Sequence, residues 1–171
     1  KNQPDGIIKI SDIQSAIRVD NIHFPKTSAI ALENTHNLCN GSPLSLDYIK
    51  DVTQIAHDND IKLHIDGARI FNAAVALDVD VKDLAMNADS VTFCLSKGLA
   101  APIGSVICGS EEFIYLARRA RKALGGGMRQ AGIIAAAGLF SLDNILDQIK
   151  KDHKNAMRLA EGINEIDGLF V

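Results

Sequence analysis

Strand-like runs of small and β-branched residues alternate with helical patterns along most of this 171-residue chain. That order is typical of a parallel sheet covered by helices, because a crossover between parallel strands needs a connection of helix length. We expect strands at residues 28–33, 61–66, 89–96 and 105–109, the first and third of them buried. The sequence therefore predicts an α/β fold with a mostly parallel sheet flanked by helices.

Helices are expected between and after these strands. The stretch 45–60 carries its apolar residues on one stripe and begins with Ser45, a residue type that caps helix starts by accepting a backbone hydrogen bond. Ser110, followed by two glutamates, marks another helix start over 110–124 in the same way. Other helices are expected at 11–17, 68–77, 81–86, 128–142 and 146–166. Of these, the segment 128–142, rich in Gly and Ala, is expected to be buried on most sides, and the helix at 146–166 is expected to be amphipathic.

Composition excludes several functional classes. The apolar fraction of 47% and charged fraction of 23% are ordinary for a soluble globular protein, and the net charge of −3 gives no basic footprint for nucleic acid. No apolar segment reaches the roughly 20 residues of a membrane span. Cys94 and Cys108 lie in strand-like runs and Cys39 in a polar loop, so we expect no disulfide framework and a cytoplasmic location. No Cys or His pair has zinc-like spacing, so no metal site is expected.

Asp66 and Lys97 follow two successive predicted strands and are the residues that point to chemistry. Alone, an Asp at a strand end is most often a helix cap, and a Lys beside a glycine is most often solvated. In a parallel sheet, however, both would lie at the carboxyl edge, where open α/β sheets bind ligands. Gly67 and Gly98 would admit a flat ring there. An amine that forms a Schiff base and a carboxylate that pairs with a protonated ring nitrogen fit pyridoxal phosphate.

Four motifs occur along the chain: ENTHN at 33–37, HIDGARIFNAAVAL at 64–77, CLSKGLAAPIGS at 94–105 and LGGGMRQAGIIAAAG at 124–138. In this order they closely resemble the L-threonine aldolases, members of the fold type I pyridoxal phosphate enzymes and of the β-eliminating lyase group. The resemblance implies an aminotransferase-like large domain, of which this chain is a fragment. It also implies cleavage of L-threonine or L-allo-threonine to glycine and acetaldehyde with pyridoxal 5'-phosphate as cofactor, a retro-aldol reaction.

The same resemblance implies roles for individual residues. Lys97 would hold the cofactor as a Schiff base, Asp66 would pair with its ring nitrogen, and Arg69 would lie near the cofactor and the substrate carboxylate. Lys122 and Arg129, on either side of a run of three glycines, would lie near the cofactor phosphate of a neighbouring subunit. We therefore expect a homodimer or homotetramer with shared active sites that acts on a small amino acid.

The resemblance also gives the domain boundaries that we expect. Residues 1–143 would be part of the large cofactor-binding domain, and residues 144–171 a helix leading toward a small C-terminal domain that is largely absent. The chain starts with Lys1 rather than Met and stops inside the apolar GLFV, as a piece of a larger protein would. Family members carry the phosphate-binding turn and the residue stacked on the ring upstream, so we expect the piece alone to bind cofactor poorly.

A base must take the proton of the substrate β-hydroxyl, and histidine is the usual candidate near neutral pH. His57 and His153 lie on charged helical segments and are expected at the surface, whereas His64 is expected to be packed and hydrogen-bonded within its strand. His36 is expected either near the active site or as a brace for its loop. His23 matches a family position close to the substrate side chain, so we select it as orienter or proton carrier, with a water molecule as the alternative.

Two other functions stay open. On the same scaffold, a β-eliminating lyase would use Lys97 as the base that deprotonates Cα. The fold could also serve as a non-catalytic oligomerisation domain, although retention of both Asp66 and Lys97 counts against this. Two positions depart from the family or vary within it. Asp78 replaces the glycine that relatives commonly show after the helix, which predicts a local loss of stability through lost C-cap geometry, and Ala100 occupies a variable position.

Overall fold

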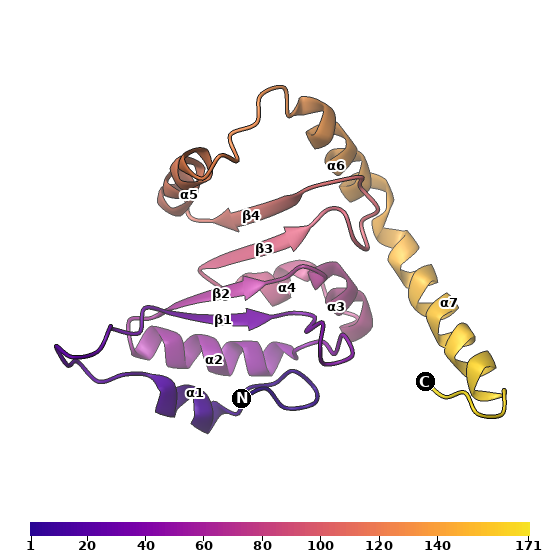
Figure 1. The fold of residues 1–171 in the computed structure, drawn as a ribbon, viewed down its shortest axis with the longest axis horizontal. Coiled ribbons are helices and arrows are strands. Elements are labelled where there is room, and N and C mark those ends of the chain that lie inside the picture. Colours follow the sequence, from indigo (N-terminus) through magenta and orange to yellow (C-terminus); the bar gives the residue numbers. More distant parts are fainter.

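The computed structural model describes residues 1–171, and its centre is one sheet of four strands in the order β1-β2-β3-β4 (Figure 1). The strands are β1 (Ala29–Glu33), β2 (Lys62–Asp66), β3 (Ser90–Cys94) and β4 (Ser105–Gly109). The first three are parallel, whereas β4 runs antiparallel to β3 because a short loop without a helix joins the two. The predicted mostly parallel sheet is confirmed.

Seven helices accompany the sheet, each within a few residues of its predicted position. They are α1 (Ile10–Ala16), α2 (Leu46–Asp58), α3 (Ile70–Leu77), α4 (Val81–Ala85), α5 (Glu111–Ala123), α6 (Gly132–Asn144) and α7 (Leu146–Asn164). The two predicted caps are confirmed, since the Ser45 and Ser110 hydroxyls accept from the amides of Tyr48 and Phe113 at 3.2 Å. No single helix is long and apolar enough to cross a membrane; α6 and α7 reach that length and composition only as a pair bent by 69°.

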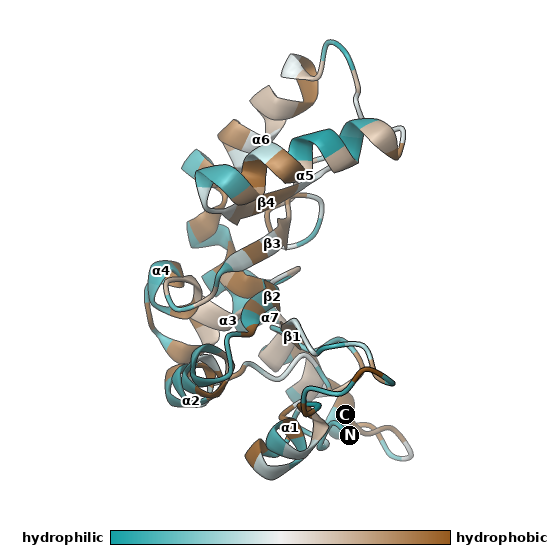
Figure 2. Ribbon diagram, turned by 90° about the vertical axis from the view of Figure 1, so that its left-hand side faces the viewer, coloured by the Kyte–Doolittle hydropathy of each residue, from teal (hydrophilic) through white to brown (hydrophobic).

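The main hydrophobic core lies behind the sheet, between the strands and the helices α2, α3 and α4 (Figures 1 and 2). Alternate strand residues point into it, and Leu32, Leu63 and Ile65 are buried there. From α2 come Ile49 and Val52, members of the apolar stripe that predicted this helix. Burying each such side chain stabilises the fold by about 1.5–3 kcal/mol, so this layer fixes the position of the strands.

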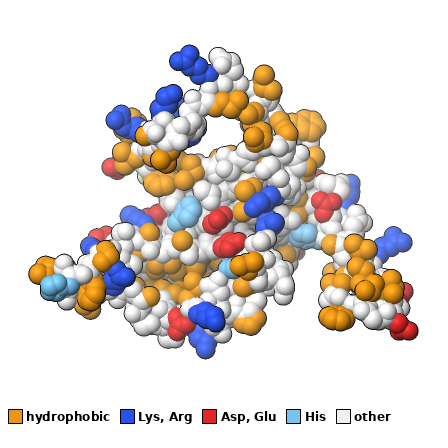
Figure 3. All heavy atoms as spheres, in the orientation of Figure 1, with side chains coloured by type: hydrophobic (Ala, Val, Ile, Leu, Met, Phe, Trp, Pro, Cys, Tyr) orange, Lys and Arg blue, Asp and Glu red, His pale blue; other side chains and the backbone are white.

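The opposite face of β1 and β2 carries small and polar side chains and is largely open. Glu33 and His64 are half-buried and Asp66 is exposed, and Figure 3 shows acidic, basic and histidine side chains gathered over this part of the molecule. Of residues 28–33, predicted as a buried strand, only Leu32 is buried. The prediction was wrong for this face because α2, α3 and α4 all pack behind the sheet.

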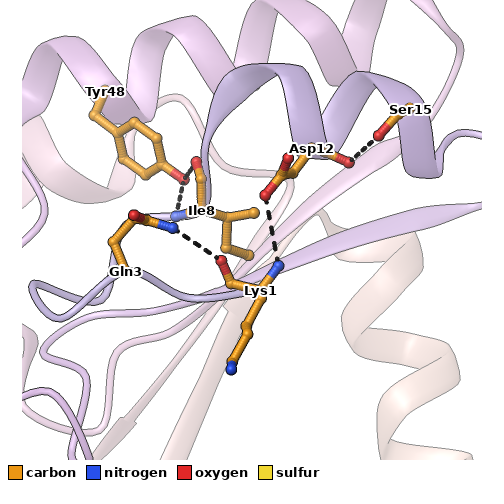
Figure 4. A network of polar contacts seen from close by, with 6 residues as sticks. All are labelled: Lys1, Gln3, Ile8, Asp12, Ser15 and Tyr48. Atoms are coloured by element: carbon orange, nitrogen blue, oxygen red, sulfur yellow. Dashed lines mark hydrogen bonds and ion pairs between the residues drawn. The ribbon is translucent and has the colours of Figure 1, made fainter.

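The N-terminal segment is held against α2 by Tyr48 (Figure 4). The Tyr48 hydroxyl donates to the Ile8 carbonyl oxygen at 2.8 Å and accepts from the Ile8 amide at 3.1 Å. Burial raises the pKa of the Tyr48 phenol, so the group keeps the proton that it donates. This pair of bonds joins positions forty residues apart and fixes the start of the chain beside the core.

Helix α6 is exposed over most of its surface, contrary to the burial predicted for 128–142. Only Gly138 and Ser141 are buried on it, whereas Leu139 and Phe140 are 63% and 62% exposed. Gly138 does admit a close neighbour, since a Cβ built there would lie 2.9 Å from Leu95 Cδ1. The small residues therefore allow close packing only around Gly138 and Ser141, and no other element of this chain covers the rest of the helix.

Helix α3 ends in a left-handed turn at Asp78, which has φ +53° and ψ +47°. The Asp78 amide still donates to the Ala74 and Val75 carbonyl oxygens. The expected loss of C-cap geometry was therefore wrong, because an aspartate adopts the conformation that glycine adopts without strain, whereas the expected local cost in stability stays a prediction. The substitution costs backbone energy rather than hydrogen bonds.

Replacing Asp78 with glycine should raise the free energy of unfolding by about 0.5–1 kcal/mol, because glycine removes the steric cost of the left-handed conformation. Urea unfolding followed by circular dichroism measures the change. Asp78→Ala is the matched control and should not stabilise, since alanine keeps the Cβ. Equal stability of the glycine variant and the wild type would show that Asp78 bears no strain.

Asp89, the residue directly before β3, contacts β2 at the amino edge of the sheet. Its carboxylate accepts from the Leu63 amide at 2.9 Å and lies 3.0 Å from Lys62 Nζ and 3.4 Å from His57 Nε2. Burial alone would raise the pKa of this carboxyl, but the bonds from Leu63, Lys62 and His57 outweigh it and hold the pKa below its ordinary value. Ionised Asp89 therefore stabilises the fold.

Asp89→Asn should lower the free energy of unfolding near neutral pH by about 0.5–1 kcal/mol, because the ion pair and one charged acceptor are lost. A lowered folded-state pKa means that this contribution is complete above the unfolded value of about 4 and disappears as pH falls through the folded value. Urea titrations at neutral and at acidic pH measure the difference in unfolding free energy between the wild type and the variant. Asp51→Asn, an exposed change on α2, is the control. An equal difference in unfolding free energy at both pH values would contradict this role of Asp89.

Candidate functional site

The carboxyl ends of β1, β2 and β3 meet at one edge of the sheet (Figure 1). Glu33, Asp66 and Thr92 are Cα partners across these three strands. Side chains of paired residues in neighbouring strands point to the same face, so these three polar groups form a row on the open face. Sequence reasoning found Asp66 but not Glu33, whose place beside it follows only from the strand register.

The backbone around Asp66 is tightly fixed. Its carbonyl oxygen accepts from the Asn34 amide at 2.8 Å, and the Gly67 amide donates to the Thr92 carbonyl oxygen at 2.8 Å. A Cβ on Gly67 would lie 2.8 Å from that same oxygen, so only glycine lets the chain turn here into α3. One carboxylate oxygen of Asp66 accepts from the Ala68 amide at 3.2 Å, which orients the side chain at the edge.

Arg69 follows at the first position before α3 and is half-buried. Its carbonyl oxygen accepts from the Ala73 amide at 3.1 Å, which opens the helix. The structure therefore brings Arg69 to the same edge as Asp66, three positions further along the chain. This placement agrees with the resemblance, and its contact with a cofactor or substrate stays a prediction.

Lys97 lies on the loop between β3 and β4, beyond the carboxyl end of β3. The side chain is exposed, and the loop is closed by bonds from the Ala101 amide to the Leu95 carbonyl oxygen and from the Ala100 amide to the Lys97 carbonyl oxygen. Since β2 and β3 are parallel neighbours, the two predicted site residues lie at one edge, Asp66 as the last residue of β2 and Lys97 on the loop after β3. The predicted arrangement of the strand ends is confirmed.

The Asp66 carboxylate and the Lys97 amine form ion pairs neither with each other nor with other residues of the chain. Both are exposed. The space at the glycine that follows each is filled by the protein itself, since a Cβ on Gly67 would lie 2.8 Å from the Thr92 carbonyl oxygen and one on Gly98 2.6 Å from Asn72 Oδ1. One free anion and one free amine at the same edge fit pyridoxal phosphate, which needs an amine for its aldehyde and an anion for its ring nitrogen. The residues present therefore suit this cofactor.

Three predicted site residues lie elsewhere. His23 is exposed on the loop that joins α1 to β1, beyond the amino end of β1 and thus at the opposite end of the sheet (Figure 1). Lys122 lies in the last turn of α5, and Arg129 lies on the loop between α5 and α6, which passes over the far side of β4. The chain does not bring these residues to Asp66, so their roles stay predictions that would require another copy.

The remaining histidines have structural contacts. His64 is confirmed as packed and hydrogen-bonded, with Nδ1 2.8 Å from Ser90 Oγ, and His57 is confirmed at the surface. His36 contacts Asn2 and Glu33, and its side chain is only 12% exposed, as expected of a residue that braces its loop. His153 was predicted at the surface, but this was wrong. It is half-buried because α7 packs against α3.

Comparison with solved structures defines the fold. The threonine aldolase of Leishmania major superposes with a TM-score of 0.79 at 21% identity, covering 95% of this chain and 48% of that one. The PLP-bound C-S lyase of Staphylococcus hominis superposes with a TM-score of 0.62 at 16% identity, covering 92% and 41%. The chain thus has the fold type I architecture of pyridoxal phosphate enzymes.

The sequence places the chain within this class. The sequence model of the Beta-eliminating lyase family matches residues 1–171, and the chain belongs to that family. Low-specificity L-threonine aldolase 1 of Arabidopsis thaliana is 50% identical over 173 aligned positions, which cover 100% of this chain and 48% of that protein. The chain spans about half the length of the curated relatives it matches.

Proposed function

We propose that the intact protein cleaves L-threonine and L-allo-threonine to glycine and acetaldehyde with pyridoxal phosphate. The observation that carries this proposal is the placement of Asp66 and Lys97 at the carboxyl ends of adjacent parallel strands, Asp66 as the last residue of β2 and Lys97 on the loop after β3. Its support from relatives is the identity of 50% to a plant protein named as a low-specificity L-threonine aldolase. The fold type I architecture supports the choice of cofactor.

The two residues have separate tasks. The Lys97 amine binds the cofactor aldehyde, and the Asp66 carboxylate favours the protonated form of the ring nitrogen, since opposite charges a few ångströms apart stabilise each other. When bound, the cofactor supplies a conjugated electron sink for the charge that is left on Cα after the Cα–Cβ bond breaks. Arg69, from the start of α3, is suited to bind the substrate carboxylate.

The proton of the β-hydroxyl needs an acceptor within hydrogen-bond reach. His23 is the residue proposed for this task, and its position beyond the amino end of β1 means that it would act in the site of another copy. Assembly with a second copy is consistent with the open surface of α6 and the preceding loop, where Leu124 and Ile133 are 88% and 82% exposed. A water molecule is the alternative acceptor.

Substitution of the two edge residues should separate their tasks. Lys97→Ala should abolish the absorbance band of the lysine-bound cofactor, because no other residue supplies the amine. Asp66→Ala should still bind part of the cofactor yet reduce kcat by at least about a thousandfold, since the ring nitrogen loses its anion. Spectra and steady-state kinetics of the intact protein measure both. An Asp66→Ala variant with wild-type turnover would rule out this role for the carboxylate.

A substrate panel should decide between the aldolase and a β-eliminating lyase, which the family description and the C-S lyase fold both favour as the second candidate. With L-threonine and L-allo-threonine we expect acetaldehyde and glycine in equal amounts. A β-elimination substrate should give no keto acid above background. Keto acid and ammonia as the main products would establish the lyase, and a colourless protein that gives neither would indicate an oligomerisation domain.

A further inference from the structure

The loop that carries Lys97 is anchored by a small hydrophobic core of its own. Leu95, Leu99 and Ala101 are at most 6% exposed in it and pack against Ile149, which is fully buried. Ile149 belongs to α7, so this helix forms part of the support of the loop. Lys97 itself is exposed, and its near neighbours on both sides therefore fix where its backbone lies.

The loop has a fixed shape as well as an anchored base. The turn is closed by the Ala100 amide, which donates to the Lys97 carbonyl oxygen at 2.9 Å. Ala100 has φ +58°, a left-handed conformation that a residue with a Cβ adopts only where its surroundings impose it. What then determines the position of the amine is how this rigid turn sits against α3 and α7.

Asn72 of α3 makes the contact between this turn and the rest of the site. A Cβ built on Gly98 would lie 2.6 Å from Asn72 Oδ1, so the amide fills the space where another residue would carry a side chain. Asn72 is half-buried and lies in the first turn of the helix that starts directly after Arg69. It therefore ties the lysine turn to the element that follows the acidic residue Asp66.

His153 holds Asn72 from the other side. The distance from Asn72 Nδ2 to His153 Nε2 is 3.1 Å, and an amide nitrogen can only donate, so Nε2 is the acceptor in this hydrogen bond. His153 lies four positions after Ile149, which places both on the same face of α7. One face of α7 thus contacts the lysine loop directly through Ile149 and indirectly through His153 and Asn72.

We propose that Asn72 and His153 are positioning residues for Lys97. This inference rests on the proposed function, in which the Lys97 amine must reach the cofactor aldehyde. Reaction between two groups depends steeply on their geometry, and displacement of one by about 1 Å can cost a hundredfold in rate. The hydrogen bond between α7 and α3 keeps the amide against Gly98 and so limits movement of the turn. Helix α7 is therefore part of the cofactor site as well as a connection toward the C-terminus.

The test uses the intact protein freed of cofactor and then mixed with pyridoxal phosphate. His153→Leu and Asn72→Ala should slow the appearance of the lysine-bound absorbance band about tenfold, with kcat reduced to a similar extent and KM within about twofold. His153→Gln should stay within about twofold of the wild type, because the amide oxygen of glutamine accepts in place of Nε2. Lys154→Leu, an exposed change at the next position of α7, is the control and should match the wild type.

Hydrogen exchange in the cofactor-free protein gives a second readout. The Ala100 and Ala101 amides, which close the loop, should exchange about tenfold faster in His153→Leu and Asn72→Ala, but not in Lys154→Leu. If His153→Leu fails to fold, as judged by circular dichroism, the contrast between His153→Gln and Asn72→Ala decides in the same way. In that case, slow band formation and faster exchange in Asn72→Ala, with neither change in His153→Gln, would support the inference.

The outcomes separate this inference from the proposed function. A wild-type protein that forms no band with pyridoxal phosphate would overturn the role of Lys97 itself. A normal wild-type band with equal rates in His153→Leu, His153→Gln and Asn72→Ala would overturn only the positioning role. A rate loss in folded His153→Leu that His153→Gln does not recover would also contradict it, because the bond to Asn72 would then be irrelevant.

Discussion

In-register pairing of three parallel strands is the constraint on which the rest of the structure depends. It aligns Glu33, Asp66 and Thr92 in one row and brings Asp66 and Lys97, distant in sequence, to the same edge. A slip of one residue would turn Asp66 toward the core behind the sheet, because strand side chains alternate between faces. The buried side chains of Leu63 and Ile65 prevent that slip, so the packing of one face fixes which side chains the other face carries.

Local patterns predicted most of the fold. The two serine caps, the stripe on α2 and the strand at Ser105–Gly109 were predictable because a helix start, an amphipathic helix and a short β-branched run are each encoded by neighbouring residues. The same holds for Asp66 and Lys97, whose positions after predicted strands placed them at one edge. Once the strands are taken as parallel, no further information is needed to place both residues together, because parallel strands have all their carboxyl ends at one edge.

Features that depend on contacts between distant elements could not be read from the sequence. His153 stands among charged residues like a surface histidine, and only the packing of α7 on α3 places it beside Asn72. Helix α6 has the composition of a buried helix, yet only Gly138 and Ser141 on it are buried by the rest of this chain. His23 precedes β1, and a role inferred from a local motif gave no information on which end of the sheet would carry it.

The left-handed conformation of Ala100, which closes the turn at Lys97, limits the positions that the Lys97 amine can reach. At φ +58°, Ala100 occupies a narrow energy well, whereas glycine would occupy several wells of similar depth. A glycine there would relax the backbone but let the tip of the turn wander through a larger volume. The methyl group therefore acts through exclusion, because it reduces the number of backbone conformations open to the turn that carries Lys97.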